Sequence, residues 1–315
     1  MEKKKLKQLV ILSGKGGTGK TSVTAAFAHL ADVGFEDQHN PSAERLRTVL
    51  VDADVDASNL ELVLSPQVLE THDFMGGQIA IIDQELCEHC GICAELCRFD
   101  AISVQDDVYT VEPVACEGCA LCFYQCPSEA IHMEEQKAGQ WFRSDSRYGP
   151  LFHASLWPAQ ENSGKLVTLV KQQGRLLAID QERELVLVDG PPGIGCPVIS
   201  AVSGADLALI VAEPTAAGIH DMERVLATTE HFCIPALVCI NKFDLYAQGT
   251  ARIQAYCADK KLPIVGKVPF DTVVTEAMVQ GQPVTAYRPD SAVSQALRAA
   301  WQRVLAALGV QEVQT

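Results

Sequence analysis

Eight cysteines form two matched runs in this chain, and their type and spacing suit metal binding. Each run has the spacing C-x2-C-x2-C-x3-C, and each cysteine of the second run follows its counterpart by 29 positions. The repeat extends beyond the cysteines, because Ala101-Ile102 recurs as Ala130-Ile131. Thiolates are soft ligands that suit iron–sulfur clusters or zinc, so the runs indicate a metal-binding segment. The runs consist of Cys87, Cys90, Cys93 and Cys97, and of Cys116, Cys119, Cys122 and Cys126.

The double run resembles that of two-cluster bacterial-type ferredoxins, in which each half wraps one [4Fe–4S] cluster. The resemblance implies that the fourth cysteine of each run ligates the cluster of the other half. Arg98 stands where this pattern usually has proline, which indicates a different backbone there and a raised potential for the adjacent cluster. Zinc, or clusters with a structural role alone, are the alternatives. The implied ligands are Cys87, Cys90, Cys93 and Cys126 for cluster 1, and Cys97, Cys116, Cys119 and Cys122 for cluster 2.

Far upstream, residues 14–21 read GKGGTGKT, which is a phosphate-binding loop. The loop follows an apolar run and opens a segment of helical composition, so backbone N–H groups and a helix N-terminus can point at phosphates. Lys20 is expected to pair with the β- and γ-phosphates, and Thr21 to hold Mg²⁺ through its hydroxyl. The expected nucleotide-binding residues of the loop are Gly14, Lys15, Gly16, Gly17, Thr18, Gly19, Lys20 and Thr21.

A second lysine in this loop narrows the class of protein. Lys15 gives the form KGGxGKT, which resembles the deviant Walker A motif of the superfamily of MinD, ParA, Mrp and the nitrogenase iron protein. The resemblance implies that Lys15 crosses a dimer interface to the phosphates of the partner, and that the ATP-bound chain is a homodimer. The alternative is that Lys15 only adds charge to its own loop.

Four carboxylates follow two of the apolar runs. By resemblance to switch I of the superfamily, Asp54 positions or activates the attacking water and Asp52 supports the Mg²⁺ shell. Asp189 resembles the switch II carboxylate that reaches Mg²⁺. Asp56 lies in the same switch I segment as Asp54, and its alternative role is to cap the helix that follows. The expected catalytic residues are Lys15, Lys20, Asp54 and Asp189, and the expected Mg²⁺ residues are Thr21, Asp52 and Asp189.

Two later segments are expected to recognise the base. The segment from Asn241 and Lys242 to Asp244 has the form NKxD, whose aspartate binds guanine in small GTPases. In the MinD-like family the corresponding asparagine usually binds adenine, so we expect ATP, with GTP as the alternative. Residues 268–271, which include Pro269, resemble the loop that flanks the base in that family.

Four cysteines lie outside the two runs. Cys233, Cys239 and Cys257 have apolar or helical surroundings and are expected to pack in the core. Cys196 ends the glycine-rich segment that begins at Asp189. In the nitrogenase iron protein a cysteine in this region ligates a cluster shared between subunits, so Cys196 is a candidate ligand between two copies. Close packing within the glycine-rich segment is the alternative.

Apolar runs alternate with helix-length segments, which predicts a doubly wound, mostly parallel α/β sheet. The cysteine runs interrupt it. We therefore expect a P-loop ATPase domain in residues 1–82 and 136–315, with an inserted α+β ferredoxin-like domain in residues 83–135. The expected strands are Leu6–Leu12, Thr48–Val51, Ile79–Ile82, Leu185–Val188, Leu207–Val211, Ala236–Ile240 and Ile264–Val268, and the expected helices include Thr21–Leu30 and Ser291–Leu308.

Composition excludes some classes of function. The chain has 315 residues and a net charge of −15, which disfavours binding to nucleic acid and suits docking to a basic redox partner. No stretch approaches the roughly 20 apolar residues of a membrane span, and the N-terminus lacks the apolar core of a secretory signal. We therefore expect a cytoplasmic protein with reduced thiols.

A phosphate-binding loop and cysteine runs on one chain lead to three hypotheses. The first is an ATP-hydrolysing dimeric switch, coupled to two [4Fe–4S] clusters, that gates electron transfer to a redox partner. The second is an assembly or carrier ATPase that passes an iron–sulfur or metal cofactor to its partner. The third is a positioning ATPase of the MinD or ParA kind.

Overall fold

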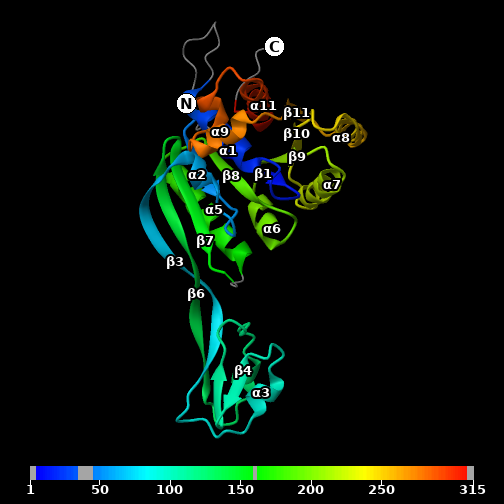
Figure 1. The fold of residues 1–315 in the computed structure, drawn as a ribbon. Helices are drawn as coiled ribbons and strands as arrows, with labels where there is room; N and C mark the ends of the chain where they lie inside the picture. The colour runs from blue at the N-terminus through cyan, green and yellow to red at the C-terminus, as the bar shows by residue number, and fades with distance from the viewer. Residues whose placement is uncertain (1–4, 35–44, 159–161, 311–315) are drawn as a thin grey trace. The chain divides into compact units, whose positions relative to one another are not determined.

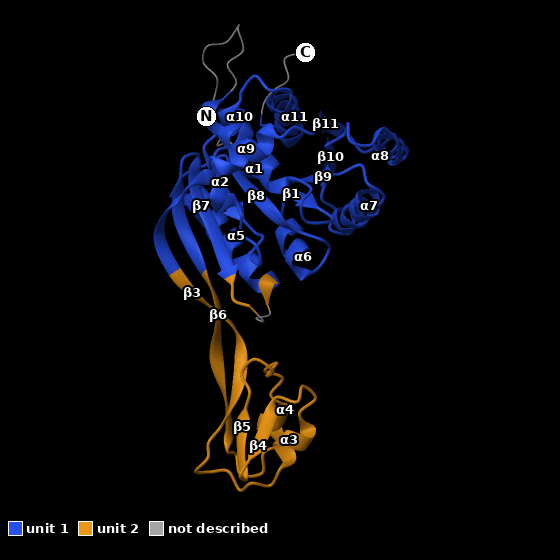
Figure 2. Cartoon of the chain, viewed as in Figure 1, with its two compact units in different colours: residues 1–71, 141–155, 164–315 blue, residues 72–140, 156–163 orange. Residues whose placement is uncertain are grey.

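The computed structural model describes residues 5–34, 45–158 and 162–310. The chain divides into two compact units (Figure 2). We call them the sheet unit, which comprises Met1–Thr71, Trp141–Ser155 and Gly164–Thr315, and the cysteine unit, which comprises His72–Gln140 and Leu156–Ser163.

One large sheet forms the centre of the sheet unit (Figure 1). Its strands within the described residues are β1 (Lys7–Ser13), β2 (Thr48–Asp52), β3 (Gln67–Ile82), β6 (Ile131–Ser146), β7 (Gly149–Leu156), β8 (Leu185–Pro192), β9 (Leu207–Ala212), β10 (Ala236–Asn241) and β11 (Ile264–Val268). They are ordered β11-β10-β9-β1-β8-β2-β7-β6-β3. All pairings from β11 to β7 are parallel. Strands β6 and β7 are joined by two residues and therefore form a hairpin.

Helices cover both faces of this sheet (Figure 1). Leu50 belongs to a core shared with α1 and α11, whereas Val49 and Val51 lie against Gly174 of α5. This arrangement confirms the predicted doubly wound, mostly parallel sheet. The helices are α1 (Lys20–Val33), α2 (Leu60–Leu64), α5 (Ser163–Asp180), α6 (Cys196–Val202), α7 (Ala216–His231), α8 (Ala247–Asp259), α9 (Val273–Val279), α10 (Val284–Tyr287) and α11 (Ala292–Leu308). In the described part of the chain, no helix combines the length and apolar character needed to cross a bilayer.

The central strands read as continuous apolar runs because both of their faces are buried. Every residue of β2 and β9 is buried, and each strand extends one residue beyond the predicted range. The predicted amphipathic helix near the C-terminus is α11, whose Trp301 is fully buried. Its ring lies 4.7 Å from that of Phe27 in α1, measured between centroids. These elements were predictable because burial determines their pattern.

The cysteine unit is wider than residues 83–135, because the 16-residue strands β3 and β6 carry the chain into it and out of it. Only Ile79–Ile82 of β3 was predicted, since the first seven residues of this strand are exposed and lack an apolar alternation. Inside the unit, β4 (Ile102–Gln105) and β5 (Val108–Val111) pair antiparallel, and α3 (Ile92–Leu96) packs on α4 (Leu121–Gln125). The assignment of residues 83–135 as a ferredoxin-like domain stays a prediction.

A hydrogen-bond chain, of which Ser144 and His153 are buried, connects β6, β7 and α2. Ser144 Oγ lies 2.9 Å from His153 Nε2, and His153 Nδ1 lies 3.1 Å from Glu61 Oε2. Burial lowers the pKa of His153 to about 4, so the imidazole is neutral near neutral pH. Its Nδ1–H then donates to Glu61 and its Nε2 accepts from Ser144. Ser144 is only 1% exposed, so this Ser–His–Glu arrangement reaches no substrate and serves to join the three elements.

Replacing His153 with glutamine is expected to reduce the loss of stability in acid. The unfolded chain protonates this histidine near the ordinary histidine pKa of 6.5, whereas the folded chain does so only near a pKa of about 4. The folded state is therefore destabilised as the pH falls through this window, by about 3 kcal/mol at most. Chemical denaturation at about pH 7 and about pH 5 should give a smaller difference in unfolding free energy for His153→Gln than for the parent. An undiminished difference would contradict the neutral buried histidine, and the exposed His220→Gln is the control.

Candidate nucleotide and metal sites

The phosphate-binding loop connects β1 to α1 and borders a large cleft with about 1610 Å³ of empty space. Gly19 has a φ angle of 95°, and a Cβ at this position would collide with the Asn241 amide, so the loop requires glycine here. Lys20 is only 6% exposed. Among the residues predicted from the sequence, those in the cleft wall are Gly16, Gly17, Gly19, Lys20, Thr21, Asp54, Asn241, Lys242 and Pro269.

Two threonines of α1 hold Asp189 beneath the loop. The Thr21 hydroxyl donates to Asp189 Oδ2 at 2.7 Å, and the Thr24 hydroxyl lies 2.9 Å from Asp189 Oδ1. Burial raises the pKa of Asp189, although Lys20 and the two hydroxyls oppose this shift. The structure therefore brings the predicted Mg²⁺ residues Thr21 and Asp189 into contact. Thr24 was missed, although its position one turn after Lys20 placed it on the same helix face.

Asp52 is hydrogen-bonded to several residues of the segment that follows β2, the one that resembles switch I of the superfamily. Its place on β2 is directly beside Asp189 on β8, and burial together with repulsion from Asp189 raises the pKa of Asp52 to about 7. Its carboxylate accepts hydrogen bonds from the Asp54 N–H, the Ser58 hydroxyl, the Asn59 N–H and the Leu60 N–H. The structure thus shows Asp52 organising the loop that follows β2, while its support of Mg²⁺ stays a prediction.

Asp54 and Asp56 line the cleft. Burial raises the pKa of Asp54 to about 6, with Asp189 and Asp56 adding to the shift and Lys20 opposing it. A carboxylate with a raised pKa can accept a proton more readily near neutral pH. This environment suits the predicted role of Asp54 in positioning the attacking water.

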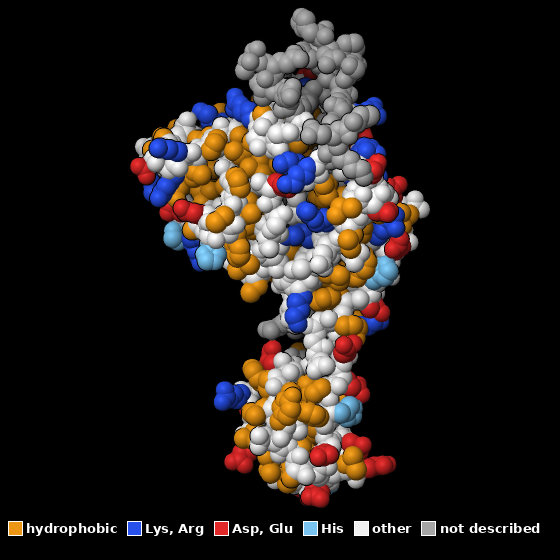
Figure 3. Space-filling model, turned by 180° about the vertical axis from the view of Figure 1, so that it is seen from behind, with side chains coloured by type: hydrophobic (Ala, Val, Ile, Leu, Met, Phe, Trp, Pro, Cys, Tyr) orange, Lys and Arg blue, Asp and Glu red, His pale blue; other side chains and the backbone are white. Residues whose placement is uncertain are grey.

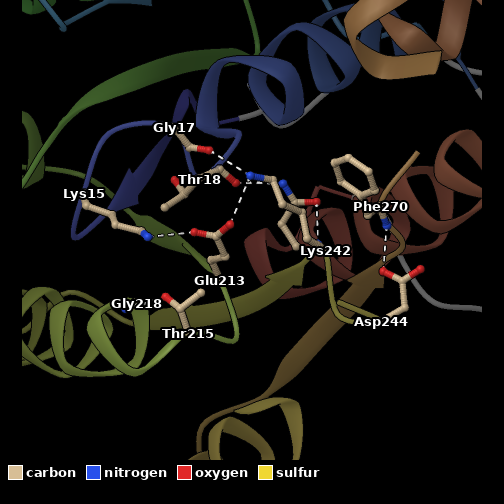
Figure 4. A network of polar contacts seen from close by, with 10 residues as sticks. Lys15, Gly17, Thr18, Glu213, Thr215, Gly218, Lys242, Asp244 and Phe270 are labelled. Carbon is tan, nitrogen blue, oxygen red and sulfur yellow. Dashed lines mark hydrogen bonds and ion pairs between the residues drawn. The ribbon is translucent and has the colours of Figure 1, made fainter. Parts of the chain in front are cut away.

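Asn241 and Lys242 brace the phosphate-binding loop from the end of β10. Asn241 Nδ2 donates to the Thr18 carbonyl at 2.7 Å. Lys242 Nζ donates to the Gly17 carbonyl at 3.1 Å (Figure 4). The NKxD motif predicted base contacts for these residues and did not indicate this bracing. Asp244, the last residue of the NKxD motif, accepts the Phe270 N–H with its Oδ1 at 2.8 Å (Figure 4).

Lys15 is paired with Glu213, a residue that sequence reasoning missed. Lys15 Nζ lies 2.8 Å from Glu213 Oε2, and Lys242 Nζ lies 3.1 Å from Glu213 Oε1 (Figure 4). Glu213 directly follows β9, and the carboxyl ends of parallel strands gather site residues at one edge of a sheet. Its position after an apolar strand was therefore the signal that could have identified it.

Two cavities of the cysteine unit have four cysteines each in their walls. Each wall combines three cysteines of one run with the fourth cysteine of the other run, as the ferredoxin resemblance implied. The first cavity is lined by Cys87, Cys90, Cys93 and Cys126, and the second by Cys97, Cys116, Cys119 and Cys122.

Matched backbone donors face one sulfur atom in each half of the unit. The Ala101 N–H donates to Cys97 Sγ and the Ala130 N–H donates to Cys126 Sγ, both at 3.3 Å. The Ser128 hydroxyl lies 3.6 Å from Cys126 Sγ. Burial alone would raise the pKa of Cys126, but these hydrogen bonds outweigh it and lower the pKa. Over the described residues, no three His, Cys, Asp or Glu side chains are arranged to hold a single metal ion.

The four remaining cysteines differ in burial. Cys239 and Cys257 are buried as predicted, and burial raises the pKa of their thiols to about 12 and about 11. The prediction for Cys233 is wrong: it is exposed, because it lies in the turn after α7 with a φ angle of 55°. Cys196 is exposed at the start of α6, and its proposed metal role stays a prediction.

Sequence comparison agrees with this geometry. The profile of the CobQ/CobB/MinD/ParA nucleotide binding domain matches residues 9–284, which extend from β1 to α10. The chain belongs to this family. It is a P-loop ATPase of the MinD/ParA type that hydrolyses nucleotide.

Three similar proteins differ in how closely they match this chain in sequence and in fold. An uncharacterized protein of Methanocaldococcus jannaschii, MJ0578, is 34% identical over 235 residues, which cover 75% of this chain and 78% of that protein. The septum site-determining protein MinD of Bacillus subtilis is 27% identical over 304 residues, 94% of this chain and 88% of MinD. MinD of Pyrococcus horikoshii, solved with Mg-ADP, has a TM-score of 0.60 at 18% identity, covering 98% of this chain and 100% of that chain, which shows a shared fold.

These relatives bear on the three hypotheses. Those with a named function are septum site-determining proteins, so the comparisons favour the positioning ATPase over the electron-transfer switch that we placed first. They contain no support for iron–sulfur chemistry, which therefore depends on the cysteine unit alone.

Proposed function

We propose that this protein is an ATP-dependent dimeric switch of the MinD or ParA kind, whose nucleotide state controls its binding to a partner protein. The observation that carries this proposal is the Lys15-containing phosphate loop beside a cleft lined by Lys20, Thr21 and Asp54. The septum site-determining relatives support the positioning class, and the Mg-ADP in the similar Pyrococcus horikoshii structure supports a magnesium nucleotide as ligand.

Each group at the site has a role in this proposal. The N–H groups of the loop and Lys20 bind the β- and γ-phosphates. Thr21 and Asp189 suit Mg²⁺, because they are oxygen donors that already lie in contact beside the loop. Asp54 orients the attacking water, and Asp52 fixes the segment that carries Asp54. Lys15 contributes its charge to the phosphates of a second copy, so the dimer completes the site.

We propose adenine as the base, bound beside Asn241, Lys242 and Pro269 in the cleft. An NKxD aspartate recognises guanine by accepting two adjacent donors with its two oxygens. Here Asn241 and Lys242 line the cleft whereas Asp244 does not, so the carboxylate that guanine recognition requires is not in the cleft wall. GTP is the alternative, and competition between the two nucleotides for binding distinguishes them.

A second candidate function follows from the cysteine unit, for which we propose two [4Fe–4S] clusters. Four thiols around each cavity and an amide donor to Cys97 and Cys126 fit such groups, which would supply one-electron redox chemistry. The switch would then gate electron delivery, or transfer of a metal cofactor, to a partner. Residues 72–140 contain 13 Asp and Glu but 2 Lys and Arg, and among the charged side chains on the visible face of this unit the acidic ones prevail, mainly around its edge (Figure 3). A partner with a basic surface is therefore favoured.

Replacing Lys15 with alanine is expected to spare nucleotide binding but to weaken the ATP-dependent dimer at least about thirtyfold, because an interfacial charge pair is lost. Sedimentation velocity with a non-hydrolysable ATP analogue measures the dimer, and nucleotide titration of the monomer measures binding. Lys260→Ala, which removes an exposed lysine after α8, is the control. Identical dimer formation by Lys15→Ala and the parent would refute the cross-subunit role.

A further inference from the structure

One carboxylate, that of Glu213, binds two lysines that serve different parts of the nucleotide site (Figure 4). Its Oε2 lies 2.8 Å from Lys15 Nζ, and its Oε1 lies 3.1 Å from Lys242 Nζ. The Glu213 side chain is 13% exposed, whereas that of Lys15 is 35% exposed. Burial alone would raise the pKa of Glu213, but the two lysines outweigh it and lower the pKa, so the carboxylate is charged.

Lys242 has more hydrogen-bond partners than Lys15. Lys242 also donates from Nζ to the Gly17 carbonyl at 3.1 Å, and its N–H bonds to Asn241 Oδ1 at 3.0 Å. For Lys15 Nζ, the described residues provide one acceptor side chain, that of Glu213. Lys15 can therefore leave without disturbing the contact that braces the loop. When it leaves, Glu213 keeps Lys242 as its counter-ion, so no buried charge is left unpaired.

We infer that Glu213 is a positioning residue that retains Lys15 within its own subunit until the phosphates of a second, nucleotide-bound copy compete for it. The inference rests on the proposed role of Lys15 across the dimer. In this inference Lys15 leaves Glu213 to reach the phosphates of the partner, so the pair within the subunit opposes association. A triphosphate carries more charge than one carboxylate, which allows the exchange to favour the dimer only when nucleotide is bound. Glu213 thus sets the concentration of ATP-bound protein at which dimers form.

Replacing Glu213 with glutamine tests this inference. Glutamine keeps the size and one acceptor of glutamate but removes the charge that retains Lys15. Because two such pairs open for each dimer, the dimer formed with a non-hydrolysable ATP analogue should have a dissociation constant about tenfold lower than that of the parent. Nucleotide affinity of the dilute monomer is titrated in parallel, so that a change in binding to the monomer is separated from the change in dimerisation. Glu230→Gln, at an exposed position on α7, is the control for the change in net charge.

Two further variants separate positioning from a structural role. Glu213→Asp keeps the charge and should return the dissociation constant towards that of the parent. In a Lys15→Ala/Glu213→Gln double variant, the gain from Glu213→Gln should disappear, because it acts through Lys15. An unchanged or weaker dimer for Glu213→Gln, or the same gain in the double variant, would overturn the inference. If Lys15→Ala itself dimerises like the parent, the proposed function fails; if only the Glu213 results fail, the proposed function stands.

Discussion

Replacing Lys20 with alanine is expected to lower ATP hydrolysis at least a hundredfold, by about the same factor as removing a central electrostatic group from other active sites. Lys20 is 6% exposed in the wall of the cleft, where its charge acts on bound phosphates with little screening by water. Its removal also deprives Asp54 and Asp189 of the cation that lowers their pKa values. The variant should therefore bind nucleotide weakly as well as turn it over slowly.

Phosphate release and nucleotide titration measure these two effects separately. Lys165→Ala, which removes an exposed lysine on α5, serves as the matched control and should behave like the parent. A Lys20→Ala protein with near-normal hydrolysis would contradict the assignment of the phosphate-binding loop. Circular dichroism should confirm that the variant retains its fold, since the change removes a buried charge.

Replacing Cys97 with alanine is expected to lower the iron content of anaerobically purified protein from about eight atoms per chain to about four, because a [4Fe–4S] cluster usually needs four thiolates. The cavity that contains Cys97 is otherwise lined by Cys116, Cys119 and Cys122. The cluster lost should therefore be the one nucleated by the second run, although Cys97 belongs to the first. Iron and sulfide analysis give the amount, and electron paramagnetic resonance of the reduced protein identifies which signal disappears.

Cys126→Ala is the reciprocal variant and should remove the other signal, because Cys126 lines the cavity of Cys87, Cys90 and Cys93. The exposed Cys233→Ala is the control and should keep about eight irons. Loss of the first-run signal in Cys97→Ala would contradict the crossed assignment. Parent protein that binds zinc rather than iron under anaerobic conditions would contradict the cluster proposal as a whole.

Burial explains which elements could be predicted from the sequence. The strand Ile264–Val268 has the bounds that its apolar run predicted, and Thr48–Val51 differs from β2 by one residue. Strands β6 and β7 were not predicted, because they carry mixed exposed and buried residues that follow no clear alternation. The width of the cysteine unit was missed for the same reason.

Site residues that belong to one local motif could be predicted from the sequence, whereas contacts between residues far apart in the chain could not. Lys20 and Thr21 were identifiable because a phosphate-binding loop is a local motif whose spacing is set by backbone geometry. Glu213 was not, since its contact with Lys15 joins the ends of two strands, β9 and β1, that are far apart in the chain but adjacent in the sheet. The same holds for the Asn241 amide, whose bond to the Thr18 carbonyl is visible only after β10 and the loop are in place.

Strands β6 and β3 are neighbours at one edge of the sheet, so the chain leaves the sheet and returns to it at adjacent positions. The main hydrophobic core has no fully buried member among the described residues between Leu64 and Leu151. Residues 83–130 could therefore be exchanged for a short turn, or for another module with closely spaced ends, without repacking that core. The same edge offers engineers a site at which to attach a different module with closely spaced ends to this ATPase sheet.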